Sequence, residues 1–419
     1  MRISVFTPSH DLSHIDRPLE SLKKQTFKDF EWVILINGKA LNSKKDLETK
    51  LTSSELKFKI IEHKEETQNI GKLKKICCTE AAGEILVELD HDDELISDCL
   101  EEIDKAFKET GCDFCYSDDY AIKDGKYITP FSPQFGWTVN KDEKGNAYHP
   151  SPEPSALTFS YIWYAPDHVR AWRKAFYQII KGHDESLEVC DDYDLLCRTY
   201  INGTVHKIRK PLYKYYHHEA NTSQNERNAE IQRLTHQLHD KYILDIASKW
   251  SDLNNLKKVD LCSCNNKPSG FIGVDKRKLN DEDIEFDLDQ PNWPFADGSV
   301  GVFRLQDALE HMKDPINTMK EMYRCLADYG WVIIEVPSTD GRGAFQDPTH
   351  VSFWNSNSFW YYTKQDQAHF IGTPVKFQMN RIDNWYPTEF HEFHNILYTK
   401  AHLVKLPDND IVPVHVREI

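Results

Sequence analysis

The chain has 419 residues, a length that predicts two or three domains, each with its own core. Its 67 acidic and 51 basic residues give a net charge of -16, which argues against general electrostatic binding to nucleic acid or anionic lipid. The 10 cysteines are unevenly spread, so we expect free thiols rather than a disulfide framework. No run approaches the roughly 20 apolar residues that span a bilayer, and the N-terminus lacks the apolar region of a signal peptide, so we expect a cytoplasmic protein.

Strands and helices alternate along the first half of the chain. Residues 3–6 predict a strand, and residues 32–36 predict a second one after a helical stripe at residues 15–22. Another helical pattern at residues 70–81 is broken by Gly83, and an apolar strand follows at once. This alternation predicts a mostly parallel sheet that is covered by helices on both faces.

The apolar strand at residues 85–89 ends abruptly in acid. Asp90, Asp92 and Asp93 follow it, and ligand crevices in open α/β sheets lie beyond the carboxyl ends of the strands. Carboxylates held together repel one another unless they are protonated or bridged by a cation such as Mg²⁺, which also leaves room for substrate phosphates. The cluster therefore indicates a metal-diphosphate site, although a solvated acidic turn or a helix N-cap fits the spacing as well.

Three later segments carry further candidates. Residues 124–154 are rich in proline, glycine, charge and aromatic rings, which predicts an ordered loop whose rings either stack on a sugar or cover the sheet edge. Asp191 and Asp192 precede an apolar helical pattern, where the helix dipole favours an ionised carboxylate. Either one could be a general base, or both could be helix caps. His218 lies in a polar, aromatic segment where a phosphate or a metal ion could bind.

Taken in order, the segments of residues 1–224 resemble the family 2 glycosyltransferases, which have the nucleotide-diphospho-sugar-binding GT-A fold. The matching segments are residues 4–8, 19–27, 31–34, 69–72, 82–84, 90–93, 116–119, 182–184, 191–194 and 218–221. One departure is Asn37, which follows the second strand where the family often has a pair of aspartates. The resemblance implies an α/β enzyme that moves a sugar from a nucleotide-diphospho-sugar to a hydroxyl of a glycan or a lipid-linked acceptor, with inversion at the anomeric carbon.

The family pattern also implies roles for individual residues. Asp192, or Asp191 in second place, deprotonates the acceptor hydroxyl. Asp90 and Asp92 hold the nucleotide sugar and its Mn²⁺ or Mg²⁺, with His218 beside the metal or the diphosphate. If Asp192 were a covalent nucleophile instead, the anomeric configuration would be retained. Further donor contacts are assigned to Thr7, Pro8, Ser9, Asn37, Asn69, Lys72 and Asp93.

Residues 225–250 lack glycine and proline and carry apolar residues at helical spacing, which predicts a connecting helix. A new α/β unit follows over residues 251–419. Its matching segments are residues 273–275, 293–299, 308–311, 314–315 and 334–337. In these it resembles the class I S-adenosylmethionine-dependent methyltransferases, which have a Rossmann-like fold.

The implied cofactor contacts of this second unit lie at the ends of its first two strands, and comprise Asp260, Cys262, Cys264 and Asp275. Asp275 would accept hydrogen bonds from the ribose of S-adenosylmethionine. The family usually has Gly-x-Gly where this chain has Cys262 and Cys264, because glycine lets the backbone approach the ligand. The unit is therefore either a working methyltransferase, which could methylate the glycan, or a domain without cofactor that serves as a scaffold or binds the acceptor.

Two other readings of the whole chain stay open. A nucleotidyltransferase or phosphotransferase could use the same carboxylates and would release pyrophosphate or transfer a phosphate. A non-catalytic glycan-binding or scaffolding protein would transfer nothing. We expect no nucleic-acid partner and no transmembrane segment, and a protein that is either free in the cytoplasm or peripheral to the membrane where glycans are assembled.

Overall fold

The computed structural model describes residues 1–65, 67, 69–131, 137–161, 165–218, 228–278, 280–281 and 283–407. The chain divides into two compact units, Met1–Ile243 and Leu244–Ile419. Helix α8 (Asn228–Leu253) passes through this division, and the domain limits expected at residues 224 and 251 stay predictions. Within the described ranges, no helix combines the length and the apolar composition that a membrane crossing requires. Asn221 of the glycosyltransferase-like pattern and residues 132–136 of the aromatic loop lie outside the described residues.

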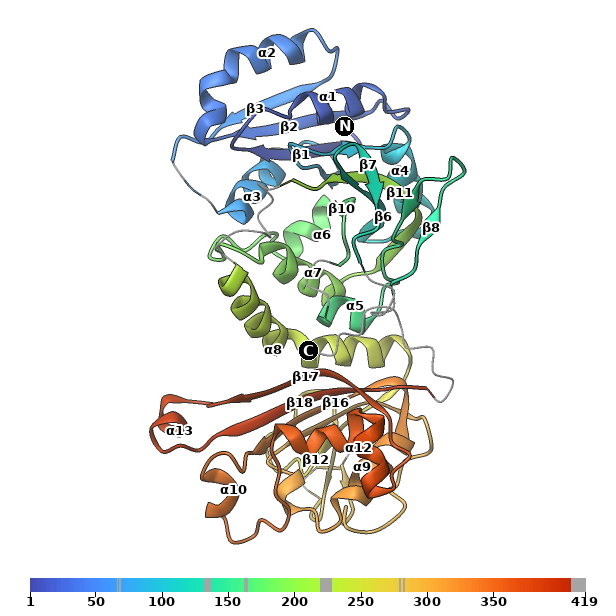
Figure 1. Cartoon of the computed structure of the whole chain (residues 1–419), viewed down its shortest axis with the longest axis vertical. Coiled ribbons are helices and arrows are strands. Elements are labelled where there is room, and N and C mark those ends of the chain that lie inside the picture. Colours follow the sequence, from blue (N-terminus) through green and yellow to red (C-terminus); the bar gives the residue numbers. More distant parts are fainter. Residues whose placement is uncertain are drawn as a thin grey trace. The chain divides into compact units, whose positions relative to one another are not determined.

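The first unit is built on a nine-stranded sheet (Figure 1). Its strands are β1 (Ile3–Ser9), β2 (Phe30–Ile36), β3 (Phe58–Glu62), β4 (Ile85–Glu88), β5 (Glu94–Leu95), β6 (Phe114–Lys123), β7 (Lys126–Ile128), β10 (Arg170–Arg173) and β11 (Val205–Tyr216). They lie in the order β3-β2-β1-β4-β10-β6-β11-β5, and β7 pairs with β6. A separate hairpin, formed by β8 (Asn140–Lys141) and β9 (Ala147–Tyr148), lies in the loop that the aromatic pattern indicates.

Strands β3, β2, β1 and β4 are parallel, as the alternating pattern predicts. Strand β10 was not predicted, and it lies antiparallel between β4 and β6. It has four residues, and its two terminal arginines hide the apolar signal of a buried strand. This insertion makes the sheet mixed and brings Arg170 next to the end of β4.

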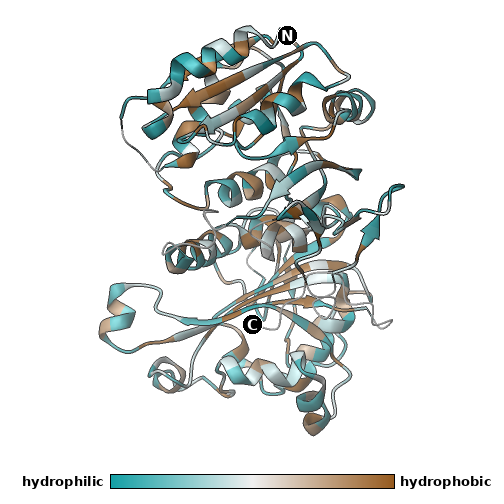
Figure 2. Ribbon diagram, turned by 45° about the horizontal axis from the view of Figure 1, so that its top comes forward, coloured by the Kyte–Doolittle hydropathy of each residue, from teal (hydrophilic) through white to brown (hydrophobic). Residues whose placement is uncertain are grey.

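The helices of the first unit are α1 (Asp16–Lys23), α2 (Lys44–Thr52), α3 (Ile70–Glu80), α4 (Cys99–Thr110), α5 (Ala156–Tyr161), α6 (Lys174–Ile179) and α7 (Asp191–Asn202), with a 3-10 turn η1 (Gly38–Ser43). Helix α4 ends at Gly111, whose φ of 68° is in the left-handed region that glycine adopts without strain. Figure 2 shows the central strands in the hydrophobic colours, and Val5, Trp32 and Val87 on them are fully buried. The cysteines of the described residues are free thiols, as expected.

The second unit has a seven-stranded sheet of its own (Figure 1). Its strands are β12 (Lys257–Leu261), β13 (Ile272–Asp275), β14 (Ile284–Glu285), β15 (Val300–Gln306), β16 (Leu326–Pro337), β17 (Phe377–Trp385) and β18 (Tyr398–Lys405). The order is β14-β13-β12-β15-β16-β18-β17, in which the first five strands are parallel and β18 is antiparallel to both β16 and β17. The helices and 3-10 turns are η4 (Leu309–His311), α9 (Pro315–Cys325), α10 (Gly343–Gln346), η5 (Ser356–Phe359), α11 (Trp360–Thr363), α12 (Gln365–Ile371) and α13 (Glu389–Phe393).

Both sheets have a point where the strand order reverses. In the first sheet β1 lies between β2 and β4, and in the second β12 lies between β13 and β15. Open α/β sheets bind ligands outside the carboxyl ends of the strands at such a point. In this chain those ends carry the Asp90 cluster in the first unit and the loop from Cys262 to Cys264 in the second. Each unit therefore presents its predicted site residues where its topology favours a ligand.

Candidate active site

The three carboxylates after β4 differ in burial. The side chains of Asp90 and Asp92 are 31% and 16% exposed, whereas Asp93 is buried. The carboxylate of Asp93 accepts hydrogen bonds from the hydroxyl of Tyr213 at 2.9 Å and from the N–H of Tyr216 at 2.8 Å. Burial raises the pKa of Asp93, and the charges of Asp90 and Asp92 raise it further. Asp93 thus fastens the loop to β11, and its two neighbours are the carboxylates that a ligand can reach.

Two histidines approach these two accessible carboxylates. His218 Nε2 lies 2.6 Å from Asp92 Oδ2, so the structure brings together two residues that were assigned to the metal. His168 Nε2 lies 3.6 Å from Asp90 Oδ2. Burial lowers the pKa of His168, but the hydrogen bond to Asp167 and the charge of Asp90 outweigh burial and raise it. His168 was not predicted, because it lies in an irregular stretch before β10 that carries no motif.

The chemistry of this donor set fits a divalent cation. Asp90 and Asp92 supply carboxylate oxygen atoms, the ligands that suit Mn²⁺ and Mg²⁺, and His218 adds an imidazole nitrogen beside them. Glu88, Asp90 and His168 also offer ligand atoms that all lie within 4.8 Å of one another. Among the described residues, His168 Nε2 has no hydrogen-bond partner.

The second acidic group opens helix α7, as the sequence pattern predicts. Asp191 is buried against α3, where a Cβ added to Gly71 would lie 2.6 Å from the Cβ of Asp191. Burial raises the pKa of Asp191 to about 6, although the charge of Lys74 opposes the rise. The side chain of Asp192 is 28% exposed, and its Oδ2 lies 3.2 Å from Nη1 of Arg170. Of the pair, Asp192 is the residue that a substrate can reach.

Arg170 connects the two acidic groups. Its Nη1 lies 3.8 Å from Glu88 Oε2, and Glu88 is the last residue of β4, two positions before Asp90. Lys74 Nζ lies 2.5 Å from the other oxygen of Glu88. Burial raises the pKa of Glu88, but Lys74 and Arg170 outweigh burial and lower it. Arg170 therefore links the end of β4, two residues before Asp90, to Asp192 through a buried network of charges that the sequence does not reveal.

Three residues that were assigned to donor binding lie at the end of strand β1. Thr7 is buried, and its hydroxyl donates to the carbonyl of Leu89 at 2.8 Å and accepts from Trp32 Nε1 at 2.9 Å. The hydroxyl of Ser9 donates to the carbonyl two residues further on at 2.7 Å, and Pro8 lies between them in the strand. These bonds hold the end of β1 to the start of the acidic loop.

The other donor candidates flank β2 and α3. The side-chain amide of Asn37 donates to the carbonyl of Thr67 at 3.2 Å, and its buried Oδ1 accepts no hydrogen bond from the described residues. Asn69 Oδ1 accepts from the N–H of Lys72 at 2.7 Å and so caps α3. Lys72 Nζ lies 3.3 Å from Glu65 on the surface. Asn37 is therefore the member of this set with an unused acceptor for a ligand.

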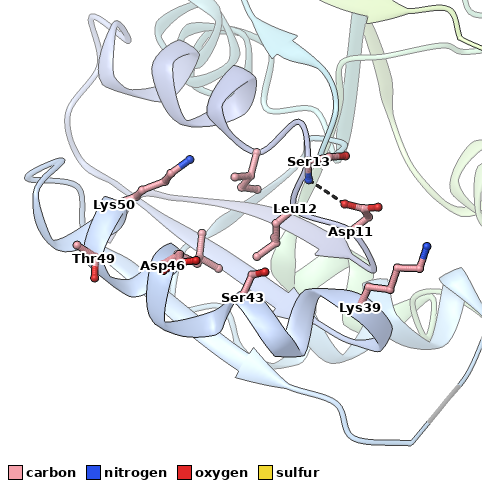
Figure 3. Close-up of a pocket in the computed structure, with 10 residues that line it drawn as sticks. Asp11, Leu12, Ser13, Lys39, Ser43, Asp46, Thr49 and Lys50 are labelled. Carbon is pink, nitrogen blue, oxygen red and sulfur yellow. Dashed lines mark hydrogen bonds between the residues drawn. The ribbon is translucent and has the colours of Figure 1, made fainter.

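A hollow of about 640 Å³ lies beside the ends of β1 and β2 (Figure 3). The loop after β1 forms one wall, where the N–H of Ser13 donates to Asp11 Oδ1 at 2.8 Å. The turn η1 and helix α2 form the other wall, which carries Lys39 and Lys50. None of the predicted donor or catalytic residues lines this hollow, so it does not define the active site.

In the second unit, the loop after β12 adopts an unusual backbone form. Cys262 and Cys264 have φ angles of 54° and 40°, in the left-handed region that normally favours glycine. Asp275, which ends β13, accepts a hydrogen bond from the N–H of Cys264 at 3.4 Å. Asp260 is buried and lies 2.9 Å from Arg304. The loop thus keeps the backbone form of a glycine turn beside an acid, which fits a ligand with ribose hydroxyls, while Asp260 lies beneath the surface of the site.

Comparisons with known proteins divide the chain in the same two parts. The model of the glycosyl transferase family 2 matches residues 4–176, and a methyltransferase-domain model matches residues 258–371. A search of curated proteins gave no significant match.

Several solved structures are similar at low identity. The crystal structure of S. aureus TarS 1-349 with UDP-GlcNAc is 19% identical over 61% of this chain and 72% of that one, with a TM-score of 0.47. The same TarS fragment with UDP is 19% identical over 61% and 71%, with a TM-score of 0.45. GalNAc-T7 with UDP, GalNAc and Mn²⁺ is 15% identical over 52% and 44%, with a TM-score of 0.38.

Proposed function

We propose that the first unit transfers a sugar from a nucleotide-diphospho-sugar to an acceptor hydroxyl. The chain joins a family 2 glycosyltransferase domain of the GT-A fold to a methyltransferase domain. The observation that carries this proposal is the pair of partly exposed carboxylates, Asp90 and Asp192, which Glu88 and Arg170 connect in one site. Glycosyl transfer needs one carboxylate to hold the donor and another to take a proton from the acceptor.

Each carboxylate has a distinct task in the proposed reaction. Asp90 and Asp92 would hold a divalent cation, whose positive charge would stabilise the departing diphosphate. Asp192 takes the proton of the acceptor hydroxyl, whose oxygen forms the new bond to the anomeric carbon while the bond from that carbon to the diphosphate oxygen breaks. Arg170 keeps the carboxylate of Asp192 in place at 3.2 Å. A single displacement of this kind inverts the anomeric configuration.

The variant Asp192→Asn tests the role of this residue. We expect the rate of transfer to fall by about 10²–10⁴-fold, because general-base catalysis contributes this much, while the KM for the donor stays unchanged. The measurement is release of free nucleoside diphosphate from a panel of nucleotide sugars with Mn²⁺. Glu101→Gln is the matched control, because it removes an exposed carboxylate from the first turn of another helix, α4. Equal activity of Asp192→Asn and Glu101→Gln would contradict the assignment.

The products separate this proposal from its rivals. Nucleotidyl or phosphoryl transfer would release pyrophosphate or move a phosphate, and a glycan-binding protein would release no nucleotide. Nuclear magnetic resonance of the new linkage shows whether the configuration is inverted, and retention would make Asp192 a covalent nucleophile.

For the second unit we propose methylation of a hydroxyl on the glycan that the first unit extends. S-adenosylmethionine supplies an electrophilic methyl group, and Asp275 would accept hydrogen bonds from its ribose. The left-handed backbone at Cys262 and Cys264 supports this proposal, since it preserves the turn for which glycine is usual. A labelled methyl group should appear on the product only after sugar transfer. Sugar transfer without methyl label would contradict methylation and favour a second unit that serves as a scaffold or binds the acceptor. If the acceptor is lipid-linked, the enzyme works at the membrane surface.

A further inference from the structure

A second cluster of metal-ligating side chains lies in the second unit, at the carboxyl edge of its sheet. Glu310 and His311 belong to the turn η4, which follows β15. A distant loop folds over them, because the N–H groups of Val351 and Ser352 donate to the carbonyl of Glu310 at 2.8 and 3.0 Å. This pairing brings His350 to Glu310, although 40 positions separate them in the sequence.

Glu310 is the unusual member of the cluster. It is 2% exposed, and neither of its carboxylate oxygens has a hydrogen-bond partner among the residues that the structure describes. No lysine or arginine of residues 228–278, 280–281 and 283–407 pairs with it. A buried carboxylate without partners is costly, so such groups commonly bind a metal or lose their charge.

The two histidines are oriented as metal ligands are. His350 Nδ1 lies 3.0 Å from the carbonyl of Ala344, and His311 Nδ1 lies 3.3 Å from the carbonyl of Thr349. When Nδ1–H donates to a carbonyl, Nε2 keeps its lone pair for a cation, and this arrangement recurs behind metal-binding histidines. His350 Nε2 lies 4.0 Å from Glu310 Oε1, and the ligand atoms of all three residues lie within 4.8 Å of one another.

We propose that Glu310, His311 and His350 bind a divalent transition-metal ion such as Zn²⁺, Co²⁺ or Mn²⁺. Two imidazoles and one carboxylate suit these ions better than Mg²⁺ or Ca²⁺, which prefer oxygen ligands. Metal bonds of about 2.0–2.2 Å need only small side-chain rotations to close the present spacing. Three protein ligands leave coordination positions open for an oxygen of a substrate.

The place of this cluster connects it with the chemistry of the second unit. Two further carboxylates add negative charge near Glu310. They are Asp307, the residue after β15, and Asp347 in the covering loop. The turn η4 follows β15, and β15 is the neighbour of β12 at the point of reversed strand order. The ion would therefore lie at the edge where the strand order favours a ligand. This site is separate from the carboxylates Asp90 and Asp92 of the first unit.

Equilibrium dialysis of the full chain against Co²⁺ tests the proposal. The parent is Asp90→Asn/Asp92→Asn, which disables the expected cation site of the first unit, so that the part of cobalt binding that Glu310→Gln weakens reports the second. We expect this parent to bind one Co²⁺ per chain, and we expect Glu310→Gln or His350→Ala added to it to raise the Kd at least tenfold. His369→Ala, which removes an exposed histidine on α12, is the control, and we expect it to leave the Kd for Co²⁺ unchanged.

Unchanged Co²⁺ affinity in Glu310→Gln and His350→Ala would overturn the proposal, as would a parent that binds no cobalt. Glu310→Gln keeps the shape of the side chain, so it should fold even if His350→Ala does not. Far-UV circular dichroism checks the fold of each variant. The rise in melting temperature with Co²⁺ gives a second readout, which the parent should show and Glu310→Gln should lose. Sugar transfer is assayed separately on the chain with Asp90 and Asp92 intact, so the two proposals can fail independently.

Discussion

Two neighbouring lysines on helix α3 show how differently the site and the surface use the same charge. Lys74 is buried and lies 2.5 Å from Glu88 at the centre of the network that joins Asp90 to Asp192. Lys75, the next residue, lies 3.0 Å from Glu185, and these side chains are 33% and 50% exposed. A buried charge that loses its partner costs much more than an exposed one, because water cannot replace the partner.

We therefore expect Lys74→Met to lower the local free energy of unfolding by about 3 kcal/mol, and Lys75→Met by less than about 1 kcal/mol. Hydrogen exchange of the α3 amides, followed by mass spectrometry, measures both in the intact chain. In the first variant Glu88 still has Arg170, whose Nη1 lies 3.8 Å away, as a cationic neighbour. Similar losses of protection in the two variants would show that Lys74 does not stabilise the buried carboxylate.

At the scale of elements, the sequence predicted most of the strands and helices on which the candidate site residues lie. The apolar run that ends in Asp90, the acidic start of α7 and the stop of α4 at Gly111 all lie where the patterns place them. Each of these signals is local, because a period, a cap or a glycine turn is written in neighbouring residues.

The parts that could not be predicted depend on residues far apart in the chain. Strand β10 is short and pairs with β4 and β6 across long separations, so no local period reveals it. Arg170 and His168 reach the site only through this strand and the residues before it. Likewise, Glu310 and His350 meet only because the covering loop pairs with η4. A single charged residue in an apolar element does not indicate a functional site until its partner is known.

The contact between α3 and α7 gives a prediction about elements. Gly71 lies in the first turn of α3, and an added Cβ would lie 2.6 Å from the Cβ of Asp191. We expect Gly71→Ala to push the start of α7 away, which destabilises the unit by about 1–3 kcal/mol and lowers the rate of transfer through misplaced Asp192.

Gly111→Ala is the matched comparison for this variant. Its φ of 68° makes alanine unfavourable by about 1 kcal/mol, but no atom lies within 4 Å of the added Cβ. We expect lower stability with unchanged activity. Urea unfolding and the release of nucleoside diphosphate, measured together, distinguish a loss through crowding from a loss through backbone conformation. Full activity in Gly71→Ala would show that α7 tolerates the displacement.

At the scale of the whole molecule, the two units have separate cores and separate sheets. Each sheet also has its own point of reversed strand order. Because open α/β sheets bind ligands at such a point, we expect one ligand site in each unit. Under the proposed function, the first unit binds the nucleotide sugar and the second binds S-adenosylmethionine. A ligand that binds only the folded form of one unit stabilises that unit.

Differential scanning calorimetry of the full chain should therefore show two transitions. A nucleotide-sugar donor with Mn²⁺ should raise one midpoint and S-adenosylmethionine the other. At a ligand concentration of 100 times the Kd the gain is about 2.7 kcal/mol, which is about 5–10 °C for a unit of this size. Asp92→Asn should reduce the donor's shift and leave the cofactor's shift intact, because Asp92 lies in the first unit, in the turn between β4 and β5. If both ligands moved both midpoints, the units would unfold together, and the two proposed sites would have to be treated as one coupled system.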